Sequence, residues 1–428
     1  MIDLRCGDAL TLLREMPEAS VDAIVTDPPY GLKFMGKAWD HGIPGVPYWE
    51  AALRVAKPGA HLLAFGGTRT FHRLACAIED AGWEIRDCVM WVYGSGFPKS
   101  HDVSKAMDRA AGVEREVVGP RANVHSRGEH KLHEGWKRPW QDDLKAVERS
   151  MSETAPATDA AKKWQGWGTA LKPAWEPVIM ARKPLVGTVA DNVQRYGTGA
   201  INVDGCRIDA NGRPAIESKS EPSCAVFGDG LNGPAAVGLT NLGRWPANVV
   251  HDGSEEVLAG FPESGNGAGA PTISKRPRNK GWVNASPGDG VQAIDNFGDS
   301  GSAARFFYCA KASRSERNAG LENWIEERFA PTMNNGIGGK EHDPETATLK
   351  HNHHPTVKPV ALMQWLCRLV TPPAGVILDP FMGSGSTGIA ADREGFAFVG
   401  FDLNPEYVEL ARRRIAADCP LFVEEHHA

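Results

Sequence analysis

The sequence lacks three features that mark other classes of protein. Its eight cysteines form no CxxC pair and no regular spacing, which argues against zinc and disulfide frameworks and favours free thiols. No apolar run reaches the roughly 18 residues that a membrane span needs. The N-terminus has no basic segment followed by an apolar one, so we expect no secretory signal and a cytoplasmic location.

An excess of positive charge is missing as well. The net charge is −6, whereas proteins that bind nucleic acids are often basic. Net charge is an average, however, so an acidic scaffold can still carry a local basic cleft. The 428 residues exceed the roughly 100 to 200 of an ordinary domain, which indicates an α/β core and a substantial second region.

The two ends of the chain have alternating strand and helix patterns. Short β-branched runs predict buried strands, and amphipathic spacing predicts helices. We predict strands at 21–26, 61–65, 83–93, 376–378 and 396–401, and helices at 8–13, 68–81, 360–370, 386–394 and 405–417. Such units indicate an α/β fold with a mixed, mostly parallel sheet and helices on both faces.

The middle of the chain is different. From Gly94 to Pro355 it is rich in Gly, Pro, Asn, Ser, Trp and Arg and has few periodic runs. Long irregular stretches are usually functional or mobile, and we predict flexible loops at 112–165 and 262–303. Two islands, Trp175–Ala181 and Ala304–Cys309, have strand character.

A glycine-rich run, Asp379–Gly388, lies between a predicted strand and a predicted helix. Glycines let the backbone turn sharply and approach a ligand, and the helix start offers free N–H groups. Asp402 ends the next strand, about 20 residues after Gly383, where a carboxylate can accept hydrogen bonds from both hydroxyls of a ribose. The layout suits a nicotinamide dinucleotide as well as S-adenosylmethionine, because Gly383, Gly385 and Gly388 also fit GxGxxG. The third interpretation of this run is a structural turn that binds no ligand.

The tetrapeptide Asp27-Pro28-Pro29-Tyr30 follows the strand at 21–26 and so falls at a carboxyl edge of the sheet, where ligands bind. An exocyclic amine of a base is a poor nucleophile because its lone pair is delocalised. The Asp27 carboxylate and the Pro28 carbonyl can each accept one of its N–H bonds and make it nucleophilic. The prolines stiffen the loop, and Tyr30 offers a ring for stacking on a flipped base. The alternative is a Pro-Pro turn with a helix-capping Asp.

These residues together resemble the amino-methyltransferases of DNA, of the permuted β class. In that class the Asp-Pro-Pro-Tyr segment comes first, a target-recognition region follows, and the cofactor loop comes last. The resemblance covers about residues 1–100, 168–186 and 353–418, and the middle is loosely similar to orphan or phage-type enzymes. It implies a circularly permuted, Rossmann-like fold and methyl transfer from S-adenosylmethionine to adenine N6 in double-stranded DNA after base flipping. It also implies a homodimer, encoded by a bacterium or a phage and associated with the nucleoid.

Carried over residue by residue, the resemblance assigns roles to several positions. Gly7-Asp8 would lie near the cofactor adenine, Thr356 and Lys358 would reach the methionine carboxylate, and Trp175–Pro177 would lie behind the flipped base. Met382 stands where the family usually has Ala or Cys, which changes only packing. The predicted catalytic residues are Asp27, Pro28, Pro29 and Tyr30. The predicted cofactor-binding residues are Asp8, Thr356, Lys358, Asp379, Phe381, Gly383, Gly385 and Asp402.

Several alternatives stay open at this point. Asp at the first position of the tetrapeptide, rather than Ser or Asn, favours adenine N6 over cytosine N4 and over a protein or amide substrate. An NAD-dependent dehydrogenase would share the glycine loop but leaves Asp27–Tyr30 unexplained. A catalytically silent DNA-binding regulator would not need Asp27, Tyr30 and the glycines intact. We predict no metal site, because His351–His354 is better explained as a polar lead-in to the cofactor segment.

Two basic stretches in the middle favour contact with DNA. The first runs from Thr272 to Trp282 and has four positive charges in six residues, which suits phosphate binding. Its Asn279 or Arg278 can read a base edge. The second runs from Arg121 to Trp140. Solvated loops are the alternative for both. The predicted DNA-binding residues are Lys275, Arg276, Arg278, Asn279, Lys280 and Arg138.

The sequence therefore predicts three regions. A catalytic core comprises residues 1–100, 166–186 and 351–420. An inserted basic loop region that contacts DNA comprises 101–165, and a target-recognition region comprises 187–350.

Overall fold

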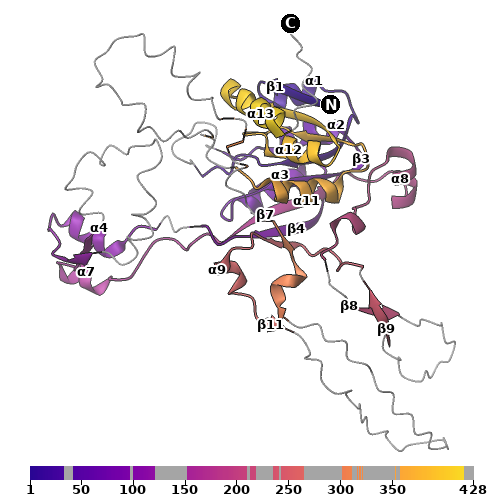
Figure 1. Ribbon diagram of the computed structural model, residues 1–428. Helices are drawn as coiled ribbons and strands as arrows, with labels where there is room; N and C mark the ends of the chain where they lie inside the picture. Colours follow the sequence, from indigo (N-terminus) through magenta and orange to yellow (C-terminus); the bar gives the residue numbers. More distant parts are fainter. Residues whose placement is uncertain are drawn as a thin grey trace, which may run out of the picture.

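A nine-stranded sheet forms the centre of the protein (Figure 1). The computed structural model describes residues 1–32, 42–96, 100–120, 152–209, 213–217, 235–240, 242–264, 301–310, 316, 318, 319, 321, 352 and 357–418. The strands lie in the order β1 (Ile2–Cys6), β15 (Ala397–Asp402), β14 (Val376–Asp379), β2 (Val21–Thr26), β3 (Ala56–Phe65), β7 (Trp175–Arg182), β4 (Glu84–Val92), β10 (Val249–His251) and β13 (Tyr308–Cys309). Only β7 runs against its neighbours. The predicted mixed, mostly parallel sheet is confirmed.

Helices cover both faces of this sheet because successive strand residues point to opposite sides. In β3, Leu62 and Ala64 belong to one buried cluster, and Leu63 and Phe65 belong to the other. The first cluster includes residues of α1 (Ala9–Glu15), α2 (Val46–Val55) and α3 (Phe71–Asp80). The second includes residues of α11 (Val360–Val370), α12 (Ser386–Arg393) and α13 (Pro405–Asp418). The sheet is therefore a buried middle layer.

The two ends of the chain interlock in the sheet. The C-terminal strands β14 and β15 lie between the N-terminal strands β1 and β2, with Ile377 beside Ala23 and Gly400 beside Leu4. After β14 the chain enters α12 on one face, whereas after β2 it enters α2 on the opposite face. The carboxyl ends of β14 and β2 therefore form a topological switch point, where open α/β sheets bind ligands.

The middle of the chain contributes strands to this sheet and smaller units beside it. Between β4 and β7 lie α4 (Val103–Ala110), β5 (Val117–Pro120), β6 (Ser152–Thr154) and α7 (Asp159–Lys163). Between β7 and β10 lie α8 (Val189–Tyr196), the 3-10 turn η3 (Asp204–Cys206), and the hairpin of β8 (Arg213–Glu217) and β9 (Ala235–Thr240). Next to β10 and β13 lie α9 (Glu255–Leu258), β11 (Glu263–Ser264), β12 (Gly301–Ser302) and η4 (Ala303–Phe306).

Most predicted elements at the two ends are confirmed to within a few residues, including the caps by Asp8 and the start of α13 at Pro405. Three predictions for the middle are partly wrong. At the two ends of the predicted loop 262–303, β11 and β12 pair as short antiparallel strands, because their backbone amides and carbonyls bond each other. Within 112–165 the described residues form β5, β6 and α7, because buried polar contacts rather than apolar periodicity hold them. In 304–309 only Tyr308–Cys309 is a strand, because the Ser302 side chain caps a 3-10 turn. None of the described helices is long and apolar enough to cross a membrane.

Candidate active site

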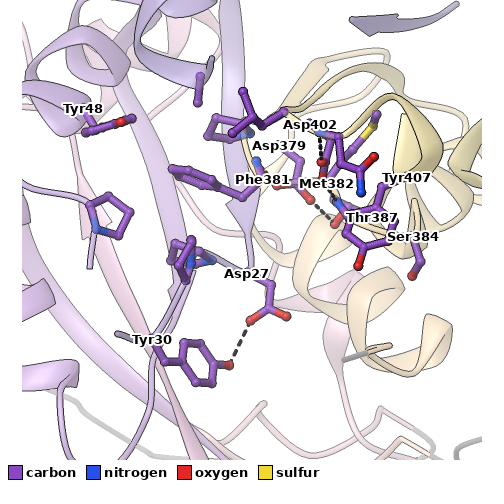
Figure 2. Close-up of a pocket in the computed structure, with 18 of the residues that line it drawn as sticks. Asp27, Tyr30, Tyr48, Asp379, Phe381, Met382, Ser384, Thr387, Asp402 and Tyr407 are labelled. Carbon is purple, nitrogen blue, oxygen red and sulfur yellow. Dashed lines mark hydrogen bonds between the residues drawn. The ribbon is translucent and has the colours of Figure 1, made fainter. Parts of the chain in front are cut away.

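One cavity of about 650 Å³ opens at the switch point between β2 and β14. Ten of the twelve residues predicted for catalysis or cofactor binding line it: Asp8, Asp27, Pro28, Pro29, Tyr30, Lys358, Asp379, Phe381, Gly383 and Asp402. Figure 2 shows Asp27 and Tyr30 together on one side of the cavity, away from Asp402 and Met382. The tertiary fold therefore unites two segments that lie about 350 residues apart in sequence.

The Asp27 side of the cavity holds a network of four charged and polar groups, Asp27, Tyr30, Glu176 and Lys358. The Tyr30 hydroxyl donates to Asp27 Oδ1 at 2.8 Å and contacts Glu176 Oε2 at 3.1 Å. Lys358 Nζ lies 2.7 Å from Asp27 Oδ2 and 3.3 Å from Glu176 Oε2. Burial raises the pKa of Tyr30 well above its usual value, with further increases from Asp27 and Glu176, so this phenol stays protonated. The network fixes the position of the Asp27 carboxylate.

Lys358 is the only cation within this network and is itself buried. Its ammonium lies 4.8 Å from the ring centre of Phe65 and 5.4 Å from that of Tyr30, a distance suited to cation–π attraction. Burial alone would lower the pKa of Lys358, but the two carboxylates outweigh burial and raise it. The site thus holds one fixed positive charge between two negative ones.

The glycine-rich loop is held by Asp379 at the end of β14. Its two carboxylate oxygens accept hydrogen bonds of 2.6 Å from Thr26 and from Thr387, and Oδ1 also accepts from the Phe381 amide at 3.1 Å. Burial raises the pKa of Asp379 to about 7, although these hydrogen bonds act in the opposite direction. Because Thr26 immediately precedes Asp27, this carboxylate ties the two halves of the cavity together.

Asp402 at the end of β15 organises the opposite side of the cavity. It accepts hydrogen bonds from the Gly383 amide at 3.0 Å and the Asn404 amide at 2.8 Å. Burial raises the pKa of Asp402 to about 6 against these two hydrogen bonds. Each oxygen keeps a further lone pair, so the carboxylate can still accept from a ligand in the cavity.

An aromatic wall completes the cavity. The ring centres of Tyr48 and Phe381 lie 6.1 Å apart, and burial, followed by the nearby Asp8, raises the pKa of Tyr48. Asp8 itself caps α1 by accepting from the Thr11 amide at 3.0 Å. Tyr48 had not been predicted from sequence, since it sits in α2 among apolar residues with no motif around it.

One described residue that was predicted to bind the cofactor, Gly385, does not line the cavity. Gly385 is the N-cap of α12 and has a φ of 78°; a Cβ there would lie 2.8 Å from Ala411 Cβ, so this glycine permits packing against α13. Thr356 lies outside the described residues, as do all six predicted DNA-binding residues. The sequence patterns assigned no individual role to Glu176, Tyr93, Ser384, Thr387 or Tyr407. Glu176 lay within the predicted segment Trp175–Pro177, and Ser384 and Thr387 lay within the glycine-rich run Asp379–Gly388.

Comparison with known proteins agrees with this geometry. The family model described as DNA methylase, N6_N4_Mtase, matches residues 21–413. The chain belongs to this DNA methylase family. The resemblance predicted from Asp27–Tyr30 and the glycine loop is thereby confirmed. The family model spans both sides of the cavity and the whole middle region between them.

Individual relatives of this methylase match over shorter stretches. It is similar to the Type II methyltransferase M2.DpnII of Streptococcus pneumoniae, with 45% identity over 65 residues, and to YubD of Escherichia coli K12, with 43% identity over 67 residues. These matches cover 15% and 16% of this chain, and the chain spans only 24% and 30% of the length of the two relatives. Among solved structures, the M1.HpyAVI–SAM complex aligns over 97% of this chain and 99% of its own, with 15% identity and a TM-score of 0.39.

Proposed function

We propose that this methylase transfers a methyl group from S-adenosylmethionine to the N6 amine of adenine in double-stranded DNA. The observation that carries the proposal is the single cavity shared by Asp27 and the glycine loop. A carboxylate suited to orient an amine and a pocket suited to a nucleoside cofactor face the same space. Either half alone would fit other functions.

The lining residues fit S-adenosylmethionine. The volume of the cavity, about 650 Å³, is in the usual range of small-molecule sites, roughly 300 to 1,000 Å³. Asp402 would hold the ribose hydroxyls, and Tyr48, Phe381 and Asp8 offer two rings and a carboxylate for the adenine. Lys358 is the one cation described near the Asp27 side, and it would reach the methionine carboxylate only by leaving one of its three present partners, Asp27, Tyr30 and Glu176.

The bound cofactor would supply an electrophilic methyl group on a sulfonium. On the protein side, Asp27 would accept one N–H bond of the base amine and the Pro28 carbonyl the other, which localises the nitrogen lone pair. Tyr30 would stack on the base, held by its hydroxyl bonds to Asp27 and Glu176 and by Thr70, which donates to its carbonyl oxygen at 2.8 Å. Asp27 can then take up the proton that the methylated amine releases.

Adenine is the proposed base because the tetrapeptide begins with Asp. Cytosine N4 is the alternative within the same chemistry, since its amine can make the same two hydrogen bonds. The assignment of residues 187–350 to target recognition and the expected homodimer rest on the family resemblance. The assignment of residues 101–165 to DNA contact, and of Lys275, Arg276, Arg278, Asn279, Lys280 and Arg138 to phosphates and bases, rests on their positive charge and hydrogen-bonding groups.

A methyl-transfer assay tests the proposal. Wild-type protein, Asp27→Ala and the control Asp80→Ala, which removes an exposed carboxylate at the end of α3, would be incubated with labelled S-adenosylmethionine and duplex DNA. We expect Asp27→Ala to lose about 10²- to 10⁴-fold in rate while the control keeps wild-type activity. Equal incorporation by Asp27→Ala would contradict the mechanism.

Two further readouts separate the alternatives. Mass spectrometry of digested DNA distinguishes N6-methyladenine from N4-methylcytosine. Calorimetry with S-adenosylmethionine and with NAD distinguishes a methyltransferase from a dehydrogenase. Tight DNA binding without methyl transfer at saturating cofactor would instead support a silent regulator.

A further inference from the structure

A small unit projects from the sheet between β4 and β7 and carries an unusual surface strip. Figure 1 shows α4 and α7 packed together beside the central sheet. Beyond α7 the chain makes a turn at residues 164–166 and returns to the sheet, and every residue from 165 to 174 is exposed. The segment leads into β7 at Trp175, directly before Glu176, which contacts Tyr30 and Lys358 in the network around Asp27.

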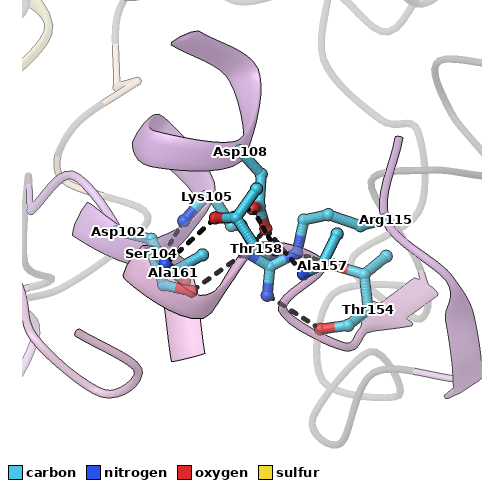
Figure 3. Close-up of polar contacts among 9 residues, drawn as sticks. All are labelled: Asp102, Ser104, Lys105, Asp108, Arg115, Thr154, Ala157, Thr158 and Ala161. Atoms are coloured by element: carbon cyan, nitrogen blue, oxygen red, sulfur yellow. Dashed lines mark hydrogen bonds and ion pairs between the residues drawn. The ribbon is translucent and has the colours of Figure 1, made fainter. Parts of the chain in front are cut away.

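The unit is held together by one buried carboxylate. Asp108 accepts hydrogen bonds from Arg115, from the backbone amides of Ala157 and Thr158, and from the Thr158 hydroxyl, at 2.8 to 3.1 Å (Figure 3). Arg115 also donates to Ser104 and Thr154. A buried charge with all its oxygens paired fixes α4 against the segment that starts α7.

Hydrogen bonds join the chain on the two sides of this unit, before α4 and after α7, where it connects the unit to the sheet. The His101 amide donates to the Thr169 hydroxyl at 2.9 Å, and the Thr169 amide donates to the Ser100 hydroxyl at 2.8 Å. Nearer the sheet, the Tyr93 amide donates to the Ala174 carbonyl at 2.9 Å. The exposed segment is therefore held at a defined place at the carboxyl edge of β4, the same edge at which Asp27 follows β2.

The strip formed by Lys162, Lys163, Trp167, Leu171 and Lys172 combines positive charge with exposed apolar groups. All three lysines are exposed, Lys162 Nζ pairs with Asp159 Oδ1 at 3.1 Å, and no Asp or Glu occurs from Ala160 to Trp175. Leu171 is 92% exposed and Trp167 60% exposed. Water solvates large apolar side chains poorly, so their exposure beside lysines indicates a partner that offers both negative charge and flat apolar faces.

Nucleic acid meets both requirements, since phosphates attract lysine and bases present apolar faces to aromatic and aliphatic side chains. We propose that the 162–172 strip is a DNA-contacting surface that holds the duplex beside the base presented to Asp27. Lys162, Lys163 and Lys172 contact phosphates, and Trp167 and Leu171 contact the sugar and base edges next to the target. This inference rests on the proposed function, because it takes the partner to be the DNA methylated at the Asp27 site.

Binding measurements on two sets of variants test this surface. A fluorescein-labelled mixed-sequence duplex would be titrated at several salt concentrations with wild type, with Lys162→Ala/Lys163→Ala/Lys172→Ala, and with Trp167→Ala/Leu171→Ala. The matched control, Arg14→Ala/Arg86→Ala/Arg195→Ala, removes three exposed charges from α1, β4 and α8. Circular dichroism and calorimetry with S-adenosylmethionine verify that fold and cofactor site are intact.

We expect the lysine variant to bind DNA at least tenfold more weakly and to lose about 2 to 3 from the slope of log affinity against log salt. The apolar variant should weaken binding several-fold with the slope unchanged, and the arginine control should match wild type.

Wild-type affinity and slope in the lysine variant would overturn the inference, even if wild type methylates DNA. Failure of wild type to methylate any DNA would instead contradict the proposed function. A change in sedimentation of the apolar variant with DNA binding unchanged would assign the strip to contact between copies of the chain and would also overturn the inference.

Discussion

Lys358 Nζ lies 2.7 Å from Asp27 Oδ2, and its own side chain is only 7% exposed. A second Lys–Asp pair, Lys57 with Asp22, has nearly the same length, 2.6 Å, but its lysine is 31% exposed. The two pairs have the same chemistry and differ in the solvent around the cation. Comparing them therefore measures how much stability the protein loses when a lysine is removed from the network around Asp27.

We predict that Lys358→Met destabilises the protein by about 2 to 4 kcal/mol, because it leaves Asp27 and Glu176 facing each other without a cation. Lys57→Met should cost less, about 1 to 2 kcal/mol, since the half-buried lysine is partly screened by water and the Val376 amide still donates to the buried Asp22. Denaturant unfolding of both variants measures the difference. Equal losses would show that the network does not depend on the buried charge.

Glu176→Gln should lower the rate of methyl transfer about tenfold, equivalent to about 1.4 kcal/mol. Gln keeps the size of the side chain and can still accept from Tyr30, but it no longer shares the charge of Lys358. The lysine would then pair with Asp27 alone and compete with the base amine for Oδ2. Single-turnover rates and cofactor affinity measure the effect, and only the rate should change.

Glu84→Gln is the control for that variant. Glu84 accepts from Arg182, at the far end of β7, at 2.7 Å. Its loss should leave the transfer rate unaltered. A wild-type rate in Glu176→Gln, or a parallel loss of cofactor affinity, would argue against a role in positioning Lys358.

Two glycines have the same left-handed backbone conformation, but only Gly385 lies in the glycine-rich loop, whereas Gly395 lies between α12 and β15. Comparing Ala substitutions at both positions distinguishes the cost of backbone strain from the cost of lost packing. Gly385 has a φ of 78° and Gly395 a φ of 77°, but a Cβ would meet Ala411 only at Gly385. Gly395→Ala should cost about 1 to 2 kcal/mol for the left-handed conformation alone. Gly385→Ala should cost more and should also weaken binding of S-adenosylmethionine, because α12 must move away from α13. Denaturation and calorimetry test the pair, and equal behaviour would exclude the packing argument.

The raised pKa of Asp379 predicts a specific dependence of stability on pH. Because the folded protein binds this proton more tightly than the unfolded chain, the contribution of Asp379 is largest in acid. It declines by about 1.4 kcal/mol per pH unit as pH rises from about 4 to about 7, and is then constant. Asp379→Asn should flatten this slope up to pH 7, and Asp402→Asn only up to about pH 6. Denaturant unfolding between about pH 4.5 and about pH 8 checks both, and an unchanged slope in Asp379→Asn would refute the assignment.

The sequence by itself determined most of the strands and helices at both ends, although not β1 and α2, because apolar periodicity and caps such as Asp8 and Asn404 act over a few neighbouring residues. It also determined the tetrapeptide and the glycine run, since Pro and Gly act on the local backbone. It could not show β10, whose three residues become a strand only by pairing with β4 and β13, nor the Asp108 unit, which depends on polar contacts between distant segments.

Only the tertiary structure decided the electrostatics of the site. Sequence patterns predicted that Asp27 and Lys358 have roles in different parts of the reaction, with the lysine assigned to the cofactor. Their 2.7 Å contact arises because α11 packs on the face of the sheet opposite α2, bringing position 358 to the carboxyl edge of β2. No local pattern encodes an ion pair between residues 331 positions apart, because its energy depends on the burial and distance that only the folded chain provides.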